Sequence, residues 1–226
     1  VEPDTPILEA VANLFFSAWK PDGRFQMYPK GGILPCHTAP AASLLCHMGY
    51  QADARLQQTF RYFLETQYAD GGWRCNKFSF GRGPETEYSN PWPTLAALDA
   101  FRFSDYLNRE PALDGPVDFL LEHWVVKKPI GPCHYGIGTL FMQVEYPFGG
   151  YNLFWYVYVL SFYNRAKRDK RFLEALAALQ SKLVDGCIIV QRVVPKLAKL
   201  NFCRKGKPSE LATRRYHEIL SNLGEC

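Results

Sequence analysis

Helical segments that are apolar on one face alternate along this chain with segments that are apolar on several faces. Apolar side chains spaced three, four and seven residues apart predict one-faced helices. These helices run through Ile7, Val11, Leu14 and Ala18; Leu56, Phe60, Phe63 and Gln67; Val117, Leu120, Leu121 and Trp124; and Phe172, Leu176, Leu179 and Leu183. Three other segments have too few polar positions for a solvated face, and we expect enclosed helices at 38–48, 94–101 and 151–163. The alternation predicts a single all-α domain over residues 1–226, built from about eight outer and inner helices.

Short turns that contain glycine recur after the one-faced helices. The three copies are Asp22-Gly23-Arg24-Phe25, Asp70-Gly71-Gly72-Trp73 and Asp185-Gly186-Cys187. Glycine supplies a left-handed turn that ends a helix, aspartate closes the turn, and the following aromatic residue fills the gap between neighbouring hairpins. Recurrence of this kind indicates a helical repeat. The segment from Cys187 to Val194 does not fit the helical repeat. Its β-branched residues predict a short hairpin arm instead.

Composition excludes several other classes of protein. The net charge is +4, and its Lys and Arg are scattered apart from clusters at 165–168 and 196–207, which we interpret as solvated faces and not as a nucleic-acid stripe. The most apolar run, 151–163, is shorter than the roughly 20 residues that a membrane span needs. Seven cysteines, an odd number, and the lack of an opening signal segment predict a cytoplasmic protein without a disulfide framework.

The phrase FLETQYADGGW, residues 63–73, resembles the Gln-Trp repeat of squalene and oxidosqualene cyclases. The Gly-Gly-Trp turn before an inner helix resembles the β subunits of protein prenyltransferases, and the motifs LPCH, DGGWRC and GPCHYGIGTLFMQVEYPF resemble bacterial proteins described as prenyltransferase-like. The resemblance implies an α/α toroid of helical hairpins around an apolar cavity. A complete ring of this superfamily has more hairpins than eight helices supply. We therefore expect an incomplete ring or a fragment, with a homo-oligomer or missing additional hairpins as the alternatives.

The resemblance implies a protein that binds an isoprenoid or another lipidic small molecule, as a prenyltransferase-like or terpenoid cyclase-like enzyme. Cyclases of this superfamily use an Asp-x-Asp-Asp acid motif, which this chain lacks. Prenyltransferases hold zinc through an Asp-x-Cys pair at an inner helix, whereas Asp185-Gly186-Cys187 follows an outer helix. A noncatalytic binding or interaction scaffold is therefore the first alternative. The second alternative is a carbohydrate-active α/α-toroid enzyme, which would use paired carboxylates.

Four residues are candidates for a zinc site, and zinc is the possible cofactor. Cys36-His37 and Cys133-His134 both come before expected inner helices, and Cys75 follows the central Gly-Gly-Trp turn. In a toroid these loops share one rim, so Cys36, Cys75, Cys133 and His134 are predicted to converge, and thiolate and imidazole are the ligands that zinc prefers. The alternative is that the cysteines pack as small apolar residues.

Two groups of residues are candidates for catalysis and for substrate binding. Glu85 and Glu87 enter the second inner helix, where a carboxylate facing an apolar cavity has a raised pKa and can donate a proton. As an alternative, they are solvated residues near a helix N-terminus. The predicted substrate-binding residues offer aromatic faces to an isoprenoid or a carbocation, although aromatic packing explains them equally well. They are Trp73, Trp92, Tyr135, Tyr151, Trp155 and Tyr158.

Overall fold

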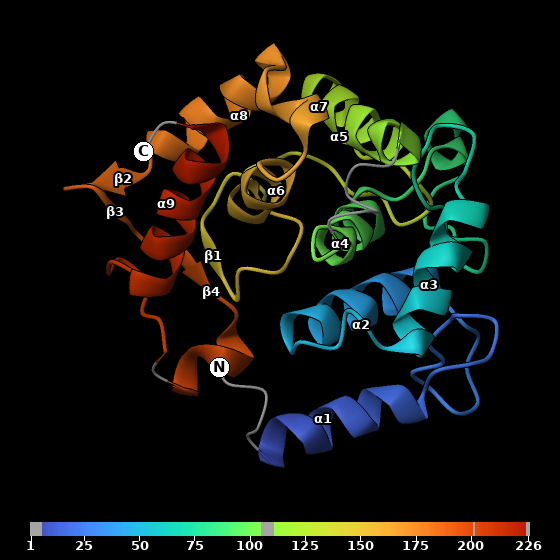
Figure 1. Cartoon of the computed structure of the whole chain (residues 1–226). Helices are drawn as coiled ribbons and strands as arrows, with labels where there is room; N and C mark the ends of the chain where they lie inside the picture. Colours follow the sequence, from blue (N-terminus) through green and yellow to red (C-terminus); the bar gives the residue numbers. More distant parts are fainter. Residues whose placement is uncertain (1–5, 105–110, 201, 225–226) are drawn as a thin grey trace. The chain divides into compact units, whose positions relative to one another are not determined.

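The computed structural model describes residues 6–104, 111–200 and 202–224, and in these ranges the chain is mainly helical, as predicted (Figure 1). The helices are α1 (Pro6–Ser17), α2 (Pro35–His47), α3 (Ala54–Glu65), α4 (Pro91–Phe101), α5 (Asp114–Val126), α6 (Leu153–Leu160), α7 (Asn164–Lys167), α8 (Lys170–Gln180) and α9 (Glu210–Leu223). Short 3-10 turns lie at η1 (Pro84–Glu87), η3 (Pro111–Leu113) and η4 (Pro195–Leu200). Across the described ranges, no helix is both long and apolar enough to cross a membrane.

Contacts along the chain divide it into two compact units. Unit 1 comprises Val1–Phe119 and Ile130–Tyr135, and unit 2 comprises Leu120–Pro129 and Gly136–Cys226. Helix α5 therefore begins in unit 1 and ends in unit 2.

In unit 1, α2 and α4 pack against each other (Figure 1). Ser43 and His47 in the second half of α2 both reach Asp99 near the end of α4. Every residue of α4 except Trp92 is buried, whereas α3 buries only one stripe. The predicted contrast between enclosed and one-faced helices is confirmed for this pair.

The first two glycine turns adopt the same local structure. The paired hydrogen bonds run from Lys20 N to Arg24 O (2.8 Å) and Gly23 N to Lys20 O (2.9 Å), and from Tyr68 N to Gly72 O (2.8 Å) and Gly71 N to Tyr68 O (2.8 Å). Gly23 and Gly71 both have positive φ, at 86° and 88°. The predicted repeat is confirmed for these two copies.

The aromatic residue after each turn is fixed to the next enclosed helix in the same way. The amide of Phe25 donates to Thr38 Oγ1 of α2 at 3.2 Å, and the amide of Trp73 donates to Thr94 Oγ1 of α4 at 3.2 Å. The Trp73 ring is buried against Phe63 and Phe101, and its Nε1 donates to Phe63 O at 3.0 Å. Trp73 therefore fills the space between α3 and α4, as the repeat predicts.

Replacing Thr94 by valine is expected to lower the free energy of unfolding by about 1–3 kcal/mol, because the buried Trp73 amide loses its acceptor while the side-chain shape is nearly kept. Urea unfolding measures the change. Thr66→Val is the matched control, since its exposed hydroxyl bonds only to Tyr62 O in its own helix. Equal effects at the two positions would contradict the role given to Thr94.

The third copy of the turn has a different structure from the first two. Asp185 and Gly186 have positive φ and join β2 (Leu183–Val184) to β3 (Cys187–Ile188) in an antiparallel hairpin. A two-residue β-hairpin turn requires positive φ at two successive residues, as found here. The prediction that this third copy joins two helical hairpins is therefore wrong. The predicted arm is also divided, because β4 (Arg192–Val193) pairs in parallel with β1 (Glu145–Tyr146) in a separate sheet.

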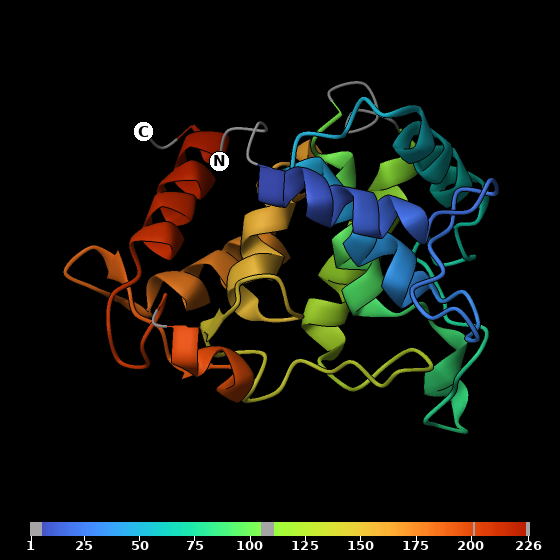
Figure 2. The ribbon, with the colours of Figure 1, turned by 90° about the horizontal axis from the view of Figure 1, so that it is seen from below.

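In unit 2, α6 is enclosed and α8 is one-faced. All eight residues of α6 are buried, which confirms the predicted burial of the aromatic segment. Helix α8 buries Phe172, Ala175, Leu176 and Leu179. Both α8 and α9 pack on α6, and α9 also contacts β3 (Figures 1 and 2).

The one-faced helices α3 and α8 begin with the same N-terminal cap. Asp53 accepts hydrogen bonds from the amide of Arg55 (2.8 Å) and from its guanidinium (2.9 and 2.7 Å). Asp169 accepts the same set from Arg171, at 2.8, 2.9 and 2.8 Å. An Asp-x-Arg cap is thus shared by α3 and α8, and the spacing of the glycine turns gives no indication of it.

Helix α1 exposes the apolar stripe that the spacing of its apolar residues predicts to be buried. Ile7 and Leu14 are 71% and 69% exposed, and Val11 is also exposed, whereas Ala12 and Phe16 are buried. The helix is apolar almost all round, with Glu9 as its only charged residue. Periodicity alone therefore selects the wrong face.

Candidate functional site

Three of the predicted rim residues converge in unit 1. Cys36 lies in the first turn of α2, Cys75 follows Trp73, and Cys133 lies in the 130–135 turn. Asn90, which precedes α4, joins two of these segments, because its amide donates to Trp73 O and its Oδ1 accepts from the amide of Cys133, both at 3.0 Å. The position expected for Cys133 is wrong, since the next enclosed helix, α6, begins only at Leu153.

The converging thiols and Tyr135 influence one another electrostatically. Burial raises the pKa of Cys133 to about 12, and the nearby Cys75 and Cys36 reinforce the increase. Burial, with a contribution from Cys75, also raises the pKa of Cys36. The pKa of the Tyr135 hydroxyl is raised by burial and by the same three cysteines. Cys36, Cys133 and Tyr135 are therefore uncharged at neutral pH.

The fourth zinc candidate faces a different partner. His134 Nε2 lies 3.5 Å from Glu85 Oε1. Within the part of the chain that the structure describes, no three His, Cys, Asp or Glu side chains are grouped so that they could hold a metal ion. The arrangement gives no support to zinc, which stays a prediction from the sequence.

The two carboxylates predicted to act as acids lie in η1, and their surroundings differ from those expected. The Glu85 side chain is partly exposed, and hydrogen bonds from its own amide and that of Gly83, with a contribution from His134, lower its pKa. The raised pKa expected for Glu85 is therefore wrong. Glu87 is 70% exposed and lies 3.7 Å from the Arg74 guanidinium. A role for either residue in catalysis stays a prediction.

Two of the six predicted aromatic residues border the thiols. The rings of Trp92 and Tyr135 lie 6.1 Å apart, and both are half-buried. Trp73 is a core residue, as described above. We call Cys36, Cys75, Trp92, Cys133 and Tyr135 the thiol–aromatic cluster.

The other three aromatic candidates belong to unit 2 and pack within it. The Tyr151 hydroxyl lies 2.6 Å from His123 Nδ1, and Tyr158 donates to Glu218 Oε2 at 2.7 Å. Trp155 is buried in α6. Because two of these hydroxyls already have polar partners, their geometry favours packing over ligand contact.

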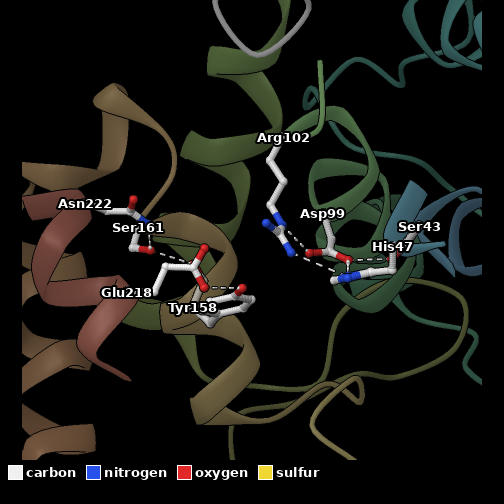
Figure 3. A network of polar contacts seen from close by, with 8 residues as sticks. All are labelled: Ser43, His47, Asp99, Arg102, Tyr158, Ser161, Glu218 and Asn222. Carbon is white, nitrogen blue, oxygen red and sulfur yellow. Dashed lines mark hydrogen bonds and ion pairs between the residues drawn. The ribbon is translucent and has the colours of Figure 1, made fainter. Parts of the chain in front are cut away.

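A second polar cluster in unit 1, absent from the sequence predictions, surrounds a fully buried carboxylate (Figure 3). Asp99 accepts a short hydrogen bond from Ser43 and lies 2.8 Å from His47 Nε2, while Arg102 Nε donates to its other oxygen at 2.7 Å. Burial by itself would raise the pKa of Asp99. The hydrogen bond from His47 and the charge of Arg102 outweigh burial and lower the pKa to about 2.

The sequence does contain a signal for this cluster. Asp99 is the one charged residue in the apolar segment 94–101, and Arg102 follows three residues later. A carboxylate in an enclosed helix needs partners, because an isolated buried charge is too costly. The partners on α2 are not predictable from spacing, since they depend on how α2 and α4 are aligned.

Unit 2 contains a polar network of its own, also drawn in Figure 3. The Tyr158 ring lies 5.1 Å from the Arg215 guanidinium, and its hydroxyl bonds to Glu218. Asn222 Nδ2 donates to Ser161 Oγ at 3.0 Å. These contacts fasten α9 to α6.

No protein-family model matches the chain. No curated protein matches it.

Proposed function

We propose that this chain is a prenyltransferase-like or terpenoid cyclase-like protein that binds an isoprenoid or another lipidic small molecule at the thiol–aromatic cluster. The observation that supports the proposal is the gathering of thiol and aromatic side chains from four separate segments of unit 1. Four of the five members are half-buried, so a ligand can reach them. Aromatic rings and neutral sulfur are polarizable groups that favour an apolar ligand.

A buried donor beside the cluster offers a contact for the polar end of such a ligand. Asn90 is fully buried, its Oδ1 is used by Cys133, and its Nδ2 has no hydrogen-bond partner. Buried polar groups are rarely left unpaired in native proteins. A hydroxyl or phosphate oxygen of the ligand would satisfy Nδ2.

Binding is better supported than catalysis. The lowered pKa of Glu85 and the exposure of Glu87 do not supply a proton donor for alkene activation. A carbohydrate-active site is disfavoured for the same reason, because such enzymes need one carboxylic acid whose pKa is raised.

A titration with farnesol, an uncharged isoprenoid alcohol, tests the proposal through tryptophan fluorescence. We expect saturable binding that Trp92→Ala weakens roughly ten-fold, since the variant removes one large apolar contact. Trp19→Ala is the matched control, because Trp19 is also half-buried in unit 1 but lies outside the cluster. No saturable binding, or equal weakening by both variants, would overturn the proposal.

A turnover test with farnesyl diphosphate distinguishes a noncatalytic carrier from an enzyme. Release of inorganic diphosphate by the wild-type protein, together with transfer of the farnesyl group to an added thiol acceptor and loss of both in Trp92→Ala, would establish transferase chemistry at this cluster. Binding without turnover would establish the noncatalytic alternative on the same site.

A further inference from the structure

The positive charge of the chain is concentrated in one part of unit 2. The segment from Pro195 to Arg215 contains seven Lys and Arg residues and one acidic residue, Glu210, whereas the net charge of the whole chain is only +4. All other residues together therefore carry a net negative charge. We call Pro195–Arg215 the basic segment.

Most cations of the basic segment have no acidic partner. Lys196, Lys199, Lys205, Lys207 and Arg214 are all exposed, and the described residues provide no ion pair for any of them. Elsewhere arginines are commonly paired, as in the pairs with Asp22, Asp53, Asp99, Asp169 and Glu145. The basic segment thus presents unneutralised positive charge to solvent.

Large apolar side chains are exposed among these cations. Phe202 is 73% exposed and Leu200 is 51% exposed, and Leu211 is exposed as well. Phe202, Leu211 and Arg214 line the same surface hollow of about 560 Å³. Leaving such side chains in water is unfavourable, so their exposure beside unpaired cations indicates an interaction surface.

We propose that the basic segment docks the protein on an anionic lipid bilayer. Unpaired lysines attract the negative surface of the bilayer, and Phe202, Leu200 and Leu211 would enter the boundary between head groups and acyl chains. Arg214 lies beside the hollow, where a lipid phosphate can accept its hydrogen bonds. The phosphates of a nucleic acid would bind these cations equally well, but exposed leucines make no favourable contact with a phosphate backbone. This docking is independent of ligand binding in unit 1.

Vesicle sedimentation tests the proposal with the full chain. We expect binding to vesicles of phosphatidylcholine with 30% phosphatidylglycerol, little binding to phosphatidylcholine alone, and weaker binding as salt is raised. Each cation contributes about five-fold to binding near an anionic surface, so Lys199→Glu with Lys205→Glu should weaken binding roughly thirty-fold or more. Lys30→Glu with Lys77→Glu is the matched control, because both lysines are exposed in unit 1.

A second pair of variants separates the bilayer from other anionic partners. Phe202→Ser should weaken vesicle binding about ten-fold, whereas Phe80→Ser, which changes a residue 75% exposed in unit 1, should not. Equal binding to neutral and anionic vesicles would overturn the proposal. So would binding of single-stranded RNA that is stronger than vesicle binding and unaffected by Phe202→Ser. Thermal unfolding of the exposed variants should match that of the wild type.

Discussion

Replacing Asp99 by alanine is expected to lower the free energy of unfolding by about 3–5 kcal/mol, because it leaves a buried guanidinium without its counter-charge. The Arg102 side chain is almost fully buried, and Ser43 and His47 lose the same acceptor. Chemical denaturation followed by circular dichroism measures the change. Asp22→Ala is the matched control, since the pair of Asp22 with Arg24 is half-exposed and should contribute less than about 1 kcal/mol.

The same carboxylate should contribute to stability in a pH-dependent manner. Its pKa is lowered from 3.8 to about 2 in the folded protein, so protons bind more readily to the unfolded chain. The contribution of Asp99 is therefore complete above pH 4 and is lost as the pH falls toward 2. Stability of the wild type should fall more steeply over this interval than that of Asp99→Ala. Parallel curves would show that Asp99 is not held in its ionised form by these partners.

Replacing Gly71 by alanine is expected to cost about 3 kcal/mol or more, from two separate causes. Gly71 has φ of +88°, and an added Cβ would lie 2.5 Å from the backbone carbon of Gly115. Neither backbone can move without displacing the turn before Trp73 or the start of α5. Thermal unfolding should show a clear decrease in the midpoint.

Gly186 provides the control for the conformational part of that cost. It has φ of +75°, but an added Cβ would meet nothing within 4 Å. Gly186→Ala should therefore cost only about 1 kcal/mol, the strain of a left-handed alanine. If the two substitutions had equal effects, close packing of Gly71 against Gly115 would not be a source of stability.

Much of the helical architecture was predictable, because enclosed helices leave a composition signal that needs no knowledge of their neighbours. The segment 94–101 and the aromatic run around α6 illustrate this. Helix α1 shows the limit of the argument, since a helix that is apolar on all sides gives no information about which side is covered. The toroid arrangement stays a prediction, because it concerns how hairpins follow one another in space.

The candidate site was predictable only in part, for a related reason. Cys36 and Cys133 were grouped because they were expected before inner helices, and Cys75 because it follows the Gly-Gly-Trp turn. The contributions of Cys75 and Cys36 to the raised pKa of Cys133 indicate that the three are neighbours. The Asn90 side chain, which holds Cys133 in place, carries no sequence signature. His134 could not be assigned, because the direction of its ring depends on the 130–135 turn and on Glu85.

The Asp-x-Arg cap has a consequence for the order in which this chain folds during synthesis. All of its hydrogen bonds lie within three consecutive residues, at Asp53–Arg55 and again at Asp169–Arg171. Nucleation is the slow step of helix formation, and a cap that needs no distant partner lowers its cost. Helices α3 and α8 can therefore begin as soon as their first turns leave the ribosome, before the following helix or strand has emerged. The segments that follow can then pack on α3 and on α8, each of which is already started, in the order in which the ribosome delivers them.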